Sequence, residues 1–305
     1  MDTKFSKPKG FGEILDHTFS LTKNRFKDFF LIILIFMGPV YLLQAIMQLI
    51  SGTSFFREIG SGNVWFEQIL SGFTETETLD TSGLGADIGI IIVGFIGAIL
   101  GPVAQAAILF AIANIRKNEE YTVGSVIKQA FSRFWPIIGS SILFGIITVM
   151  IILIPIIIVT VTAIFGFQAN PVLGVLGAIL LFLGFAVGIG LLLTRWSFYL
   201  GSVVLDKDSP GLERSWRLSR KRTWTLMGLY IVFYLIISAI EFAVQMTFGL
   251  ALGNSVLLSL ISNLATLITT IIFSVGYAVM YLDLKTRHDG DDLKDMIENY
   301  NTKTI

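Results

Sequence analysis

Residues 136–197 read PIIGSSILFGIITVMIILIPIIIVTVTAIFGFQANPVLGVLGAILLFLGFAVGIGLLLTRWS, and no charged side chain occurs between Arg133 and Arg195. A helix needs about 20 mainly apolar residues to cross the hydrocarbon core of a bilayer. Two such spans fit in this stretch, Pro136–Ile164 and Val172–Ser197. Because a helix in the core of a soluble protein rarely stays uncharged for so long, the stretch predicts two membrane-spanning helices.

Further spans of the same kind lie on either side of this pair: Phe29–Ile50, Asp87–Ile115, Trp224–Phe248 and Val256–Leu284. The first span is too long for the apolar region of a signal peptide and follows the polar-rich residues 1–28. We therefore expect it to stay as a membrane anchor. The sequence predicts an all-α polytopic membrane helix bundle of six transmembrane helices within residues 29–284.

The composition agrees with a lipid environment. Hydrophobic residues make up 54% of the chain and charged residues 14%, and the mean hydropathy is +0.77. A typical soluble domain is about 25% charged. This balance excludes a disordered chain and a nucleic-acid-binding protein, and the lack of cysteine excludes a disulfide scaffold.

The basic residues predict the orientation of the spans. Every Lys and Arg except Arg57 lies in residues 1–28, in the second or fourth connection, or in the tail 285–305. Because Lys and Arg concentrate in cytoplasmic segments, we expect both termini in the cytoplasm. The outer loop, about residues 51–86, is acidic. It contains a helix-like apolar spacing at Trp65, Phe66, Ile69, Leu70 and Phe73.

An apolar stripe at helical spacing precedes the first, third and fifth spans, in residues 11–26, about 122–135 and about 210–222. Phe19, Phe131 and Trp216 occupy equivalent points of these segments. The pattern predicts three hairpin repeats, each preceded by a cytoplasmic amphipathic interfacial helix. A shorter stripe in the tail predicts a fourth, degenerate helix after the last span, with Leu293, Met296, Ile297 and Tyr300.

Interfacial helices bury an apolar face in the bilayer while their cations meet anionic lipid headgroups. Two interpretations stay open. The helices only anchor and orient the bundle, or they form a docking surface for a protein or lipid partner. The candidate cytoplasmic docking or headgroup surface consists of Arg195, Arg214, Trp216, Arg217, Arg220 and Lys221.

Polar residues inside the membrane are costly and often functional. Glu241 lies in the outer part of the fifth span, with Gln245 one turn further on the same face. Asn254 and Asn263, near the start of the sixth span, can face them across the hairpin. These four residues form a candidate polar pocket open to the outer side. The alternative is a carboxylate that reaches interfacial water or is hydrogen-bonded by Asn263.

Small residues four apart allow close approach of transmembrane helices. Gly97 and Gly101 in the second span and Gly184 and Gly188 in the fourth follow this spacing. Since these spans are the second helices of their hairpins, we expect them in a tightly packed inner ring.

No catalytic or metal-binding pattern stands out. The two histidines, His17 and His288, lie in separate segments without the spacing of a shared metal site, and no zinc-protease, nucleophile-elbow or P-loop motif occurs. We expect no enzymatic activity and no cofactor.

Three stretches resemble a known family: KGFGEILDHTFSLTKNRFKDFF at 9–30, LERSWRLSRKRTW at 212–224 and YLDLKTRHDGDDL at 281–293. They are similar to the bacterial six-span proteins named after the membrane domain of glycerophosphoryl diester phosphodiesterases. The most specific motifs are Ser215–Leu218 and Tyr281–Lys285. The resemblance implies a bacterial cytoplasmic membrane protein. It implies no activity for this chain, since a separate soluble domain performs the chemistry in the phosphodiesterases, and we expect no such domain here.

Two functional hypotheses follow, and an enzyme is a remote third. The first is a non-catalytic scaffold or accessory subunit in envelope or membrane homeostasis, which depends on the cytoplasmic helices. The second is a small transporter or lipid-handling protein that uses the polar pocket near Glu241. The expected partners are the bilayer, anionic lipid headgroups and a protein at the cytoplasmic face, with no nucleic acid.

Overall fold

The computed structural model describes residues 5, 7–56 and 84–302, and these residues form helices and connections with no strand. Six helical stretches are long and apolar enough to cross a membrane: Phe26–Ile50, Ile91–Lys117, Phe134–Gly166, Pro171–Asp206, Thr223–Leu252 and Val256–His288. The predicted all-α, six-span class is confirmed. The apolar spacing predicted as a short helix at residues 65–73 lies outside the described residues.

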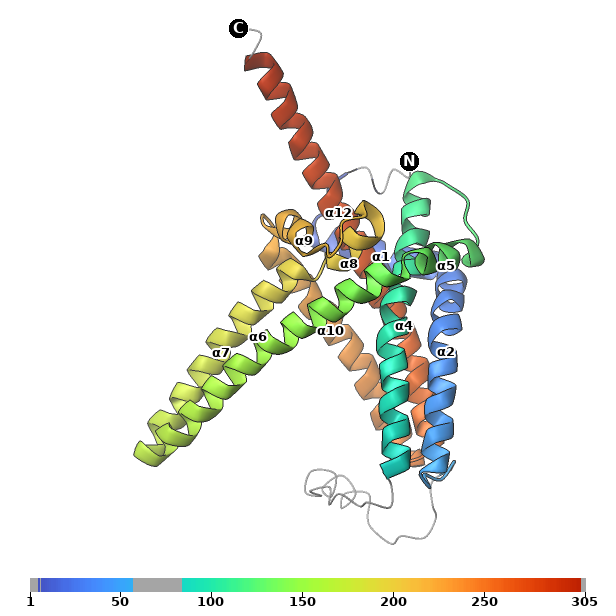
Figure 1. The fold of residues 1–305 in the computed structure, drawn as a ribbon, viewed down its shortest axis with the longest axis vertical. Helices are drawn as coiled ribbons and strands as arrows, with labels where there is room; N and C mark the ends of the chain where they lie inside the picture. The colour runs from blue at the N-terminus through green and yellow to red at the C-terminus, as the bar shows by residue number, and fades with distance from the viewer. Residues whose placement is uncertain (1–4, 6, 57–83, 303–305) are drawn as a thin grey trace.

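Short helices precede the first, third and fifth spans, as Figure 1 shows at the end where both termini lie. We call this the terminal end. Helix α1 (Phe11–Asn24) leads into α2 (Phe26–Ile50), α5 (Val123–Ser132) into α6 (Phe134–Ala169), and α9 (Leu212–Ser219) into α10 (Thr223–Val244).

The same kind of joint ends each short helix. Arg25, Arg133 and Arg222 are the N-cap residues of α2, α6 and α10, with φ −123°, −115° and −135° and ψ 26°, 21° and 18°. Each arginine N–H bonds back to the preceding short helix. Aligned on these joints, Phe19 and Trp216 share a register, while Phe131 lies one helical turn closer to its arginine.

The spans divide into a bundle and an arm. Helices α2, α4 (Leu84–Lys117) and α12 (Val256–Thr302) run side by side, and α10 packs against α12. Helices α6 and α7 (Pro171–Trp196) pair with each other and lean away from the bundle (Figure 1). We call the α6–α7 pair the arm. Of its apolar windows only 6% is buried inside the protein, against 44% for α4. The prediction that the second and fourth spans lie in a tightly packed inner ring therefore fits α4 but is wrong for α7.

The arm is closed at its far tip. A Cβ on Gly166 would lie 2.8 Å from the Gly174 Cα atom, so the two backbones nearly touch there. Asn170 caps α7 by accepting bonds from the N–H groups of Val172 and Leu173 at 3.1 and 3.2 Å. This pairing makes the arm a self-contained hairpin.

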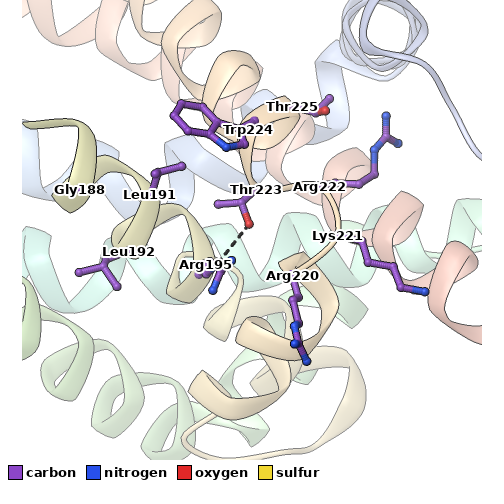
Figure 2. A pocket seen from close by; sticks show the side chains of 10 residues that line it. All are labelled: Gly188, Leu191, Leu192, Arg195, Arg220, Lys221, Arg222, Thr223, Trp224 and Thr225. Atoms are coloured by element: carbon purple, nitrogen blue, oxygen red, sulfur yellow. Dashed lines mark hydrogen bonds between the residues drawn. The ribbon is translucent and has the colours of Figure 1, made fainter.

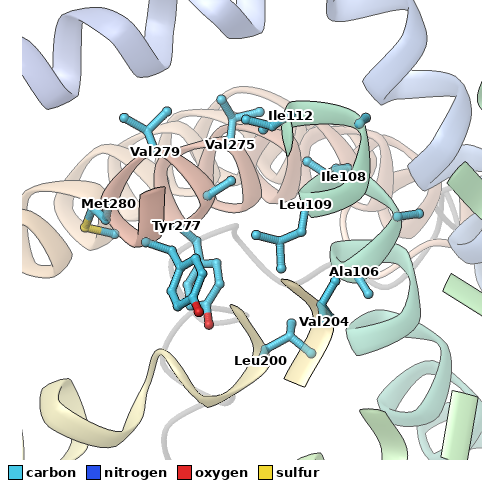
Figure 3. Packing of buried hydrophobic residues seen from close by; sticks show 14 of the residues in the cluster. Ala106, Ile108, Leu109, Ile112, Leu200, Val204, Val275, Tyr277, Val279 and Met280 are labelled. Carbon is cyan, nitrogen blue, oxygen red and sulfur yellow. The ribbon is translucent and has the colours of Figure 1, made fainter. Parts of the chain in front are cut away.

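The densest packing lies at the terminal end. After Trp196 the chain turns and continues as α8 (Tyr199–Gly201) and the π-helix η3 (Ser202–Asp206). These two elements pack against α4 and bond to Tyr277 and Tyr281 of α12. Leu200 and Val204 face Ala106 and Leu109 of α4, close to Tyr277 of α12 (Figure 3). The residues that follow the fourth span therefore do not form a surface loop, and most of those of α8 and η3 are buried in the core.

Two further helical details differ from the predictions. Helix α12 is continuous from Val256 to Thr302, so residues 285–302 prolong the sixth span instead of starting a separate tail helix. At the other end of the hairpin, α10 continues into η4 (Gln245–Gly249) and α11 (Leu250–Leu252) before the turn to α12. Because α12 extends beyond the predicted sixth span, it places polar side chains at the terminal end of the molecule.

Candidate functional site

The terminal end holds a buried carboxylate, Asp206, at the end of η3. Its side chain is 9% exposed. Arg214 of α9 donates to it at 3.0 Å, Tyr281 of α12 donates its hydroxyl at 2.8 Å, and Lys285 of α12 is ion-paired with it. A buried charge is tolerated only when it is paired and hydrogen-bonded, and these three partners meet that requirement.

A second buried carboxylate, Asp283, lies on α12 between Tyr281 and Lys285 in the sequence, and its side chain is 3% exposed. It accepts bonds from the Lys9 backbone N–H at 2.7 Å, Arg222 Nη1 at 3.3 Å and Arg287 Nε at 2.9 Å. The two guanidinium groups also donate to the Lys9 carbonyl oxygen, at 3.2 and 2.6 Å. Burial, and then the charge of Arg287, lower the pKa of Arg222.

These contacts tie distant parts of the chain together. We call the set the ion-pair cluster: it joins the N-terminal segment, η3, α9, the joint before α10, and α12. Its six charged members are Asp206, Arg214, Arg222, Asp283, Lys285 and Arg287.

Serine hydroxyls hold α9 against the end of α7. Ser215 and Ser219 donate to the carbonyl oxygen of Arg195 at 2.6 and 3.2 Å, and Ser215 accepts from the Phe198 N–H at 3.0 Å. Because the last carbonyl groups of a helix lack partners within it, these bonds stabilise the end of α7. The buried face of α9 is therefore Ser215, Leu218 and Ser219.

The predicted docking surface divides in the structure. Arg214 belongs to the ion-pair cluster and is not a surface cation. The Arg195 guanidinium lies 4.5 Å from the Trp216 ring centroid and donates through Nε to Thr223 at 3.2 Å. The side chains of Arg217, Arg220 and Lys221 are exposed.

An open pocket of about 610 Å³ lies between the end of α7 and the start of α10 (Figure 2). Gly188, Leu191 and Leu192 of α7 form its apolar side. The remaining lining residues come from the joint and the first turn of α10, together with the last turn of α7: Arg195, Arg220, Lys221, Arg222, Thr223, Trp224 and Thr225. No acidic residue lines this pocket. It unites three of the predicted surface residues, Arg195, Arg220 and Lys221.

The four residues of the predicted outer polar pocket do not form a closed pocket in the structure. Glu241, Gln245 and Asn254 are exposed, and Asn263 donates to Gln44 of α2 at 3.4 Å. Asn263 thus joins α12 to α2 instead of bonding Glu241. The buried Gln48 Oε1, further along α2, has no hydrogen-bond partner within the described chain.

The four predicted packing glycines also differ from one another. A Cβ on Gly97 would contact Val40 of α2 at 3.4 Å. Nothing lies within 4 Å of such an atom at Gly101, Gly184 or Gly188. The structure therefore brings a helix against Gly97 but leaves the other three open, two of them because the arm leans away from the bundle.

The connection between α4 and α5 is anchored by a tyrosine. The Tyr121 hydroxyl donates to Asp28 of α2 at 3.1 Å. Burial and the Asp28 charge raise the pKa of Tyr121 to about 12, so the hydroxyl keeps its proton at neutral pH. Among the residues that the structure describes, no group of three or more His, Asp or Glu side chains could hold a metal ion.

The two buried carboxylates are site residues that the sequence patterns did not predict. Asp283 lies within the motif Tyr281–Lys285, and Asp206 follows directly after an apolar stretch. A charged residue at the end of a predicted span reads as an ordinary interfacial group, and only the turn at Ser197 carries Asp206 inward. For Asp283 the available signal was Arg287 at helical spacing i+4. For Asp206 the sequence held no such local signal, because its partners Arg214 and Lys285 are 8 and 79 residues away.

No family model matches the chain, and no curated protein or solved structure matches it significantly. The resemblance to the phosphodiesterase membrane-domain proteins stays a sequence-based hypothesis.

Proposed function

We propose that the protein is a non-catalytic scaffold or accessory subunit of a bacterial cytoplasmic membrane. The observation that carries this proposal is the contrast between the terminal end, which buried ion pairs hold together, and the arm, which is hardly buried within the protein. The buried charged side chains pair with one another and hold helices together at the terminal end. The arm, by contrast, presents apolar side chains almost all round.

The proposal includes an orientation with both termini in the cytoplasm. Its support is the concentration of basic residues at the terminal end, where α1, α5 and α9 also lie. We further propose that these three helices are interfacial. Phe11 and Phe19 of α1, and Phe131 and Trp135 around the joint after α5, are exposed aromatic side chains suited to the headgroup region.

We also propose that the chain contains three diverged copies of one unit, a short helix followed by a hairpin. The matching backbone angles at Arg25, Arg133 and Arg222 support this. The family resemblance is proposed on the same footing. Ser215–Leu218 and Tyr281–Lys285 hold residues that close the end of α7 and build the ion-pair cluster, which gives both motifs a structural reason.

Site-specific photo-crosslinking in living cells tests the scaffold role. A photoreactive residue is placed at Leu180 on the arm, 70% exposed, and for comparison at Leu42 on α2, 61% exposed. We expect a discrete protein adduct from Leu180 and none from Leu42. Adducts to lipid alone at both positions contradict the scaffold role.

A second proposed function, lipid handling or transport at the outer polar residues, has one favourable observation. Gln48 of α2 has a buried side-chain oxygen without a hydrogen-bond partner in the described chain, and Glu241 of α10, like Gln48, lies toward the end of its helix away from the termini. Complementation of a deletion strain by Glu241→Ala, compared with Arg217→Ala, tests it. Transport predicts that only Glu241→Ala fails, and equal complementation by both variants overturns the second function.

A further inference from the structure

The pocket between α7 and α10 combines two kinds of wall. Leu191 and Leu192 belong to the apolar part of the fourth span, whereas Arg195 and Arg220 stand at its terminal end (Figure 2). A site that changes from apolar to cationic along the membrane normal matches the change from acyl chain to headgroup in a phospholipid. The exposed indole of Trp224, 64% accessible, stands at this boundary, where tryptophan concentrates in membrane proteins.

The cations of the pocket are suited to an anion from outside the chain. Within the described residues no carboxylate lies at ion-pair distance from Arg195 or Arg220, in contrast to Arg214, Arg222 and Arg287. Arg195 is nevertheless held in place by Trp216 and Thr223. An arginine that is fixed but lacks an acidic partner keeps its other N–H groups for bidentate contact with a phosphate.

The N-terminus of α10 also favours an anion in this pocket. Thr223, Trp224 and Thr225 line the pocket and are the first residues of the helix, and no side chain caps them. The first N–H groups of a helix have no partner within it and favour a bound anion. Their positive end therefore reinforces the charge of Arg195 and Arg220.

We infer that this pocket binds the phosphate of an anionic glycerophospholipid from the surrounding leaflet, with an acyl chain along Gly188, Leu191 and Leu192. The lipid, not a soluble phosphate, is the occupant because the apolar wall continues down the fourth span into the bilayer. This inference is independent of the scaffold role, since it needs no partner protein at the arm.

Native mass spectrometry of the full chain in mild detergent tests the inference. The probes are dioleoyl phosphatidylglycerol and dioleoyl phosphatidylcholine, which differ in headgroup charge but not in chains. We expect one phosphatidylglycerol retained per chain in preference to phosphatidylcholine. Exchanging both cations, Arg195→Gln with Arg220→Gln, is expected to lower phosphatidylglycerol retention about tenfold or more. Arg220→Gln alone, at an exposed position, gives a smaller loss without risk to folding.

Matched controls separate the pocket from general surface charge. Arg217→Gln removes an exposed cation of the same segment that does not line the pocket, and we expect it to change retention less than twofold. Gly188→Leu fills the apolar wall without a backbone clash, because nothing lies within 4 Å of a Cβ there. It should lower retention, while Gly145→Leu, equally open but on α6 and outside the pocket lining, should not.

Three results would overturn the inference. Equal retention of the two lipids shows that headgroup charge is not recognised. An equal loss from Arg217→Gln shows only diffuse attraction to a basic surface. Displacement of phosphatidylglycerol by equimolar glycerol 3-phosphate shows that the site serves a soluble phosphate and that the apolar wall contributes nothing.

Discussion

Asp283 shows how a single buried charge can organise one end of a membrane protein. Its two oxygens receive a backbone N–H and two arginines from three separate parts of the chain. Removing one partner of a buried ion pair costs far more than the pair contributes, because the other charges stay behind unpaired. Asp283 should therefore matter for folding, and no direct ligand contact is needed to explain it.

Exchange of Asp283 for asparagine keeps the shape but removes the charge. We expect Asp283→Asn to lower the free energy of unfolding by about 3 kcal/mol, since Arg222 and Arg287 then face each other without compensation. Unfolding by denaturing detergent, followed by circular dichroism, measures this. Asp208→Asn is the control, because Asp208 is exposed. Similar stability of both variants would mean that water already screens the cluster.

Among the elements, α8 and η3 illustrate what the sequence could and could not predict. The span before them was predictable because length and hydropathy alone define a membrane helix. The inward turn after Trp196 was not, since it depends on Ser215 and Ser219 reaching the Arg195 carbonyl from a helix further along the chain. The apolar stripe predicted before the fifth span contains Trp216, whereas the structure buries Ser215, Leu218 and Ser219 of α9.

The candidate site, too, was predictable from the sequence only in part. Arg195, Arg220 and Lys221 were predicted from charge and position, and the structure places all three around one pocket. Its apolar wall was not predicted, because the glycine spacing in α7 indicated a neighbouring helix at Gly188. The lean of the arm, which leaves that wall open, results from packing that no local pattern encodes.

The close fit of α8 gives a prediction at Gly201. A Cβ there would lie 2.5 Å from the Tyr281 ring, which is itself fully buried. We expect Gly201→Ala to destabilise the protein by about 1–3 kcal/mol, the usual cost of overpacking a core. Gly184→Ala on the open arm is the matched control and should unfold at the wild-type temperature in detergent. An unchanged melting temperature for Gly201→Ala would contradict the packing of α8 on α12.

The proposed orientation of the chain in the membrane can be measured directly by cysteine labelling, because the sequence contains no cysteine of its own. Ser51 follows α2 at the end away from the termini, and Glu120 lies in the connection at the terminal end. An impermeant maleimide should label Ser51→Cys in intact cells and Glu120→Cys only after permeabilisation, because the basic connections stay inside. The reverse pattern would invert the proposed topology and place the pocket in the opposite leaflet.

The length of α12 has a mechanical consequence. At roughly 1.5 Å per residue, its 47 residues form a rod of about 70 Å, well beyond the thickness of a bilayer. The rod is clamped near Asp283, and roughly 30 Å of helix continues past that point to Thr302. A sideways force at the tip therefore acts with leverage on the clamp. A force applied to the C-terminal end, for example by a tether, would tend to rotate α12 about this clamp. The rotation would displace Tyr277 and Tyr281, and with them α8 and η3, to which they are hydrogen-bonded.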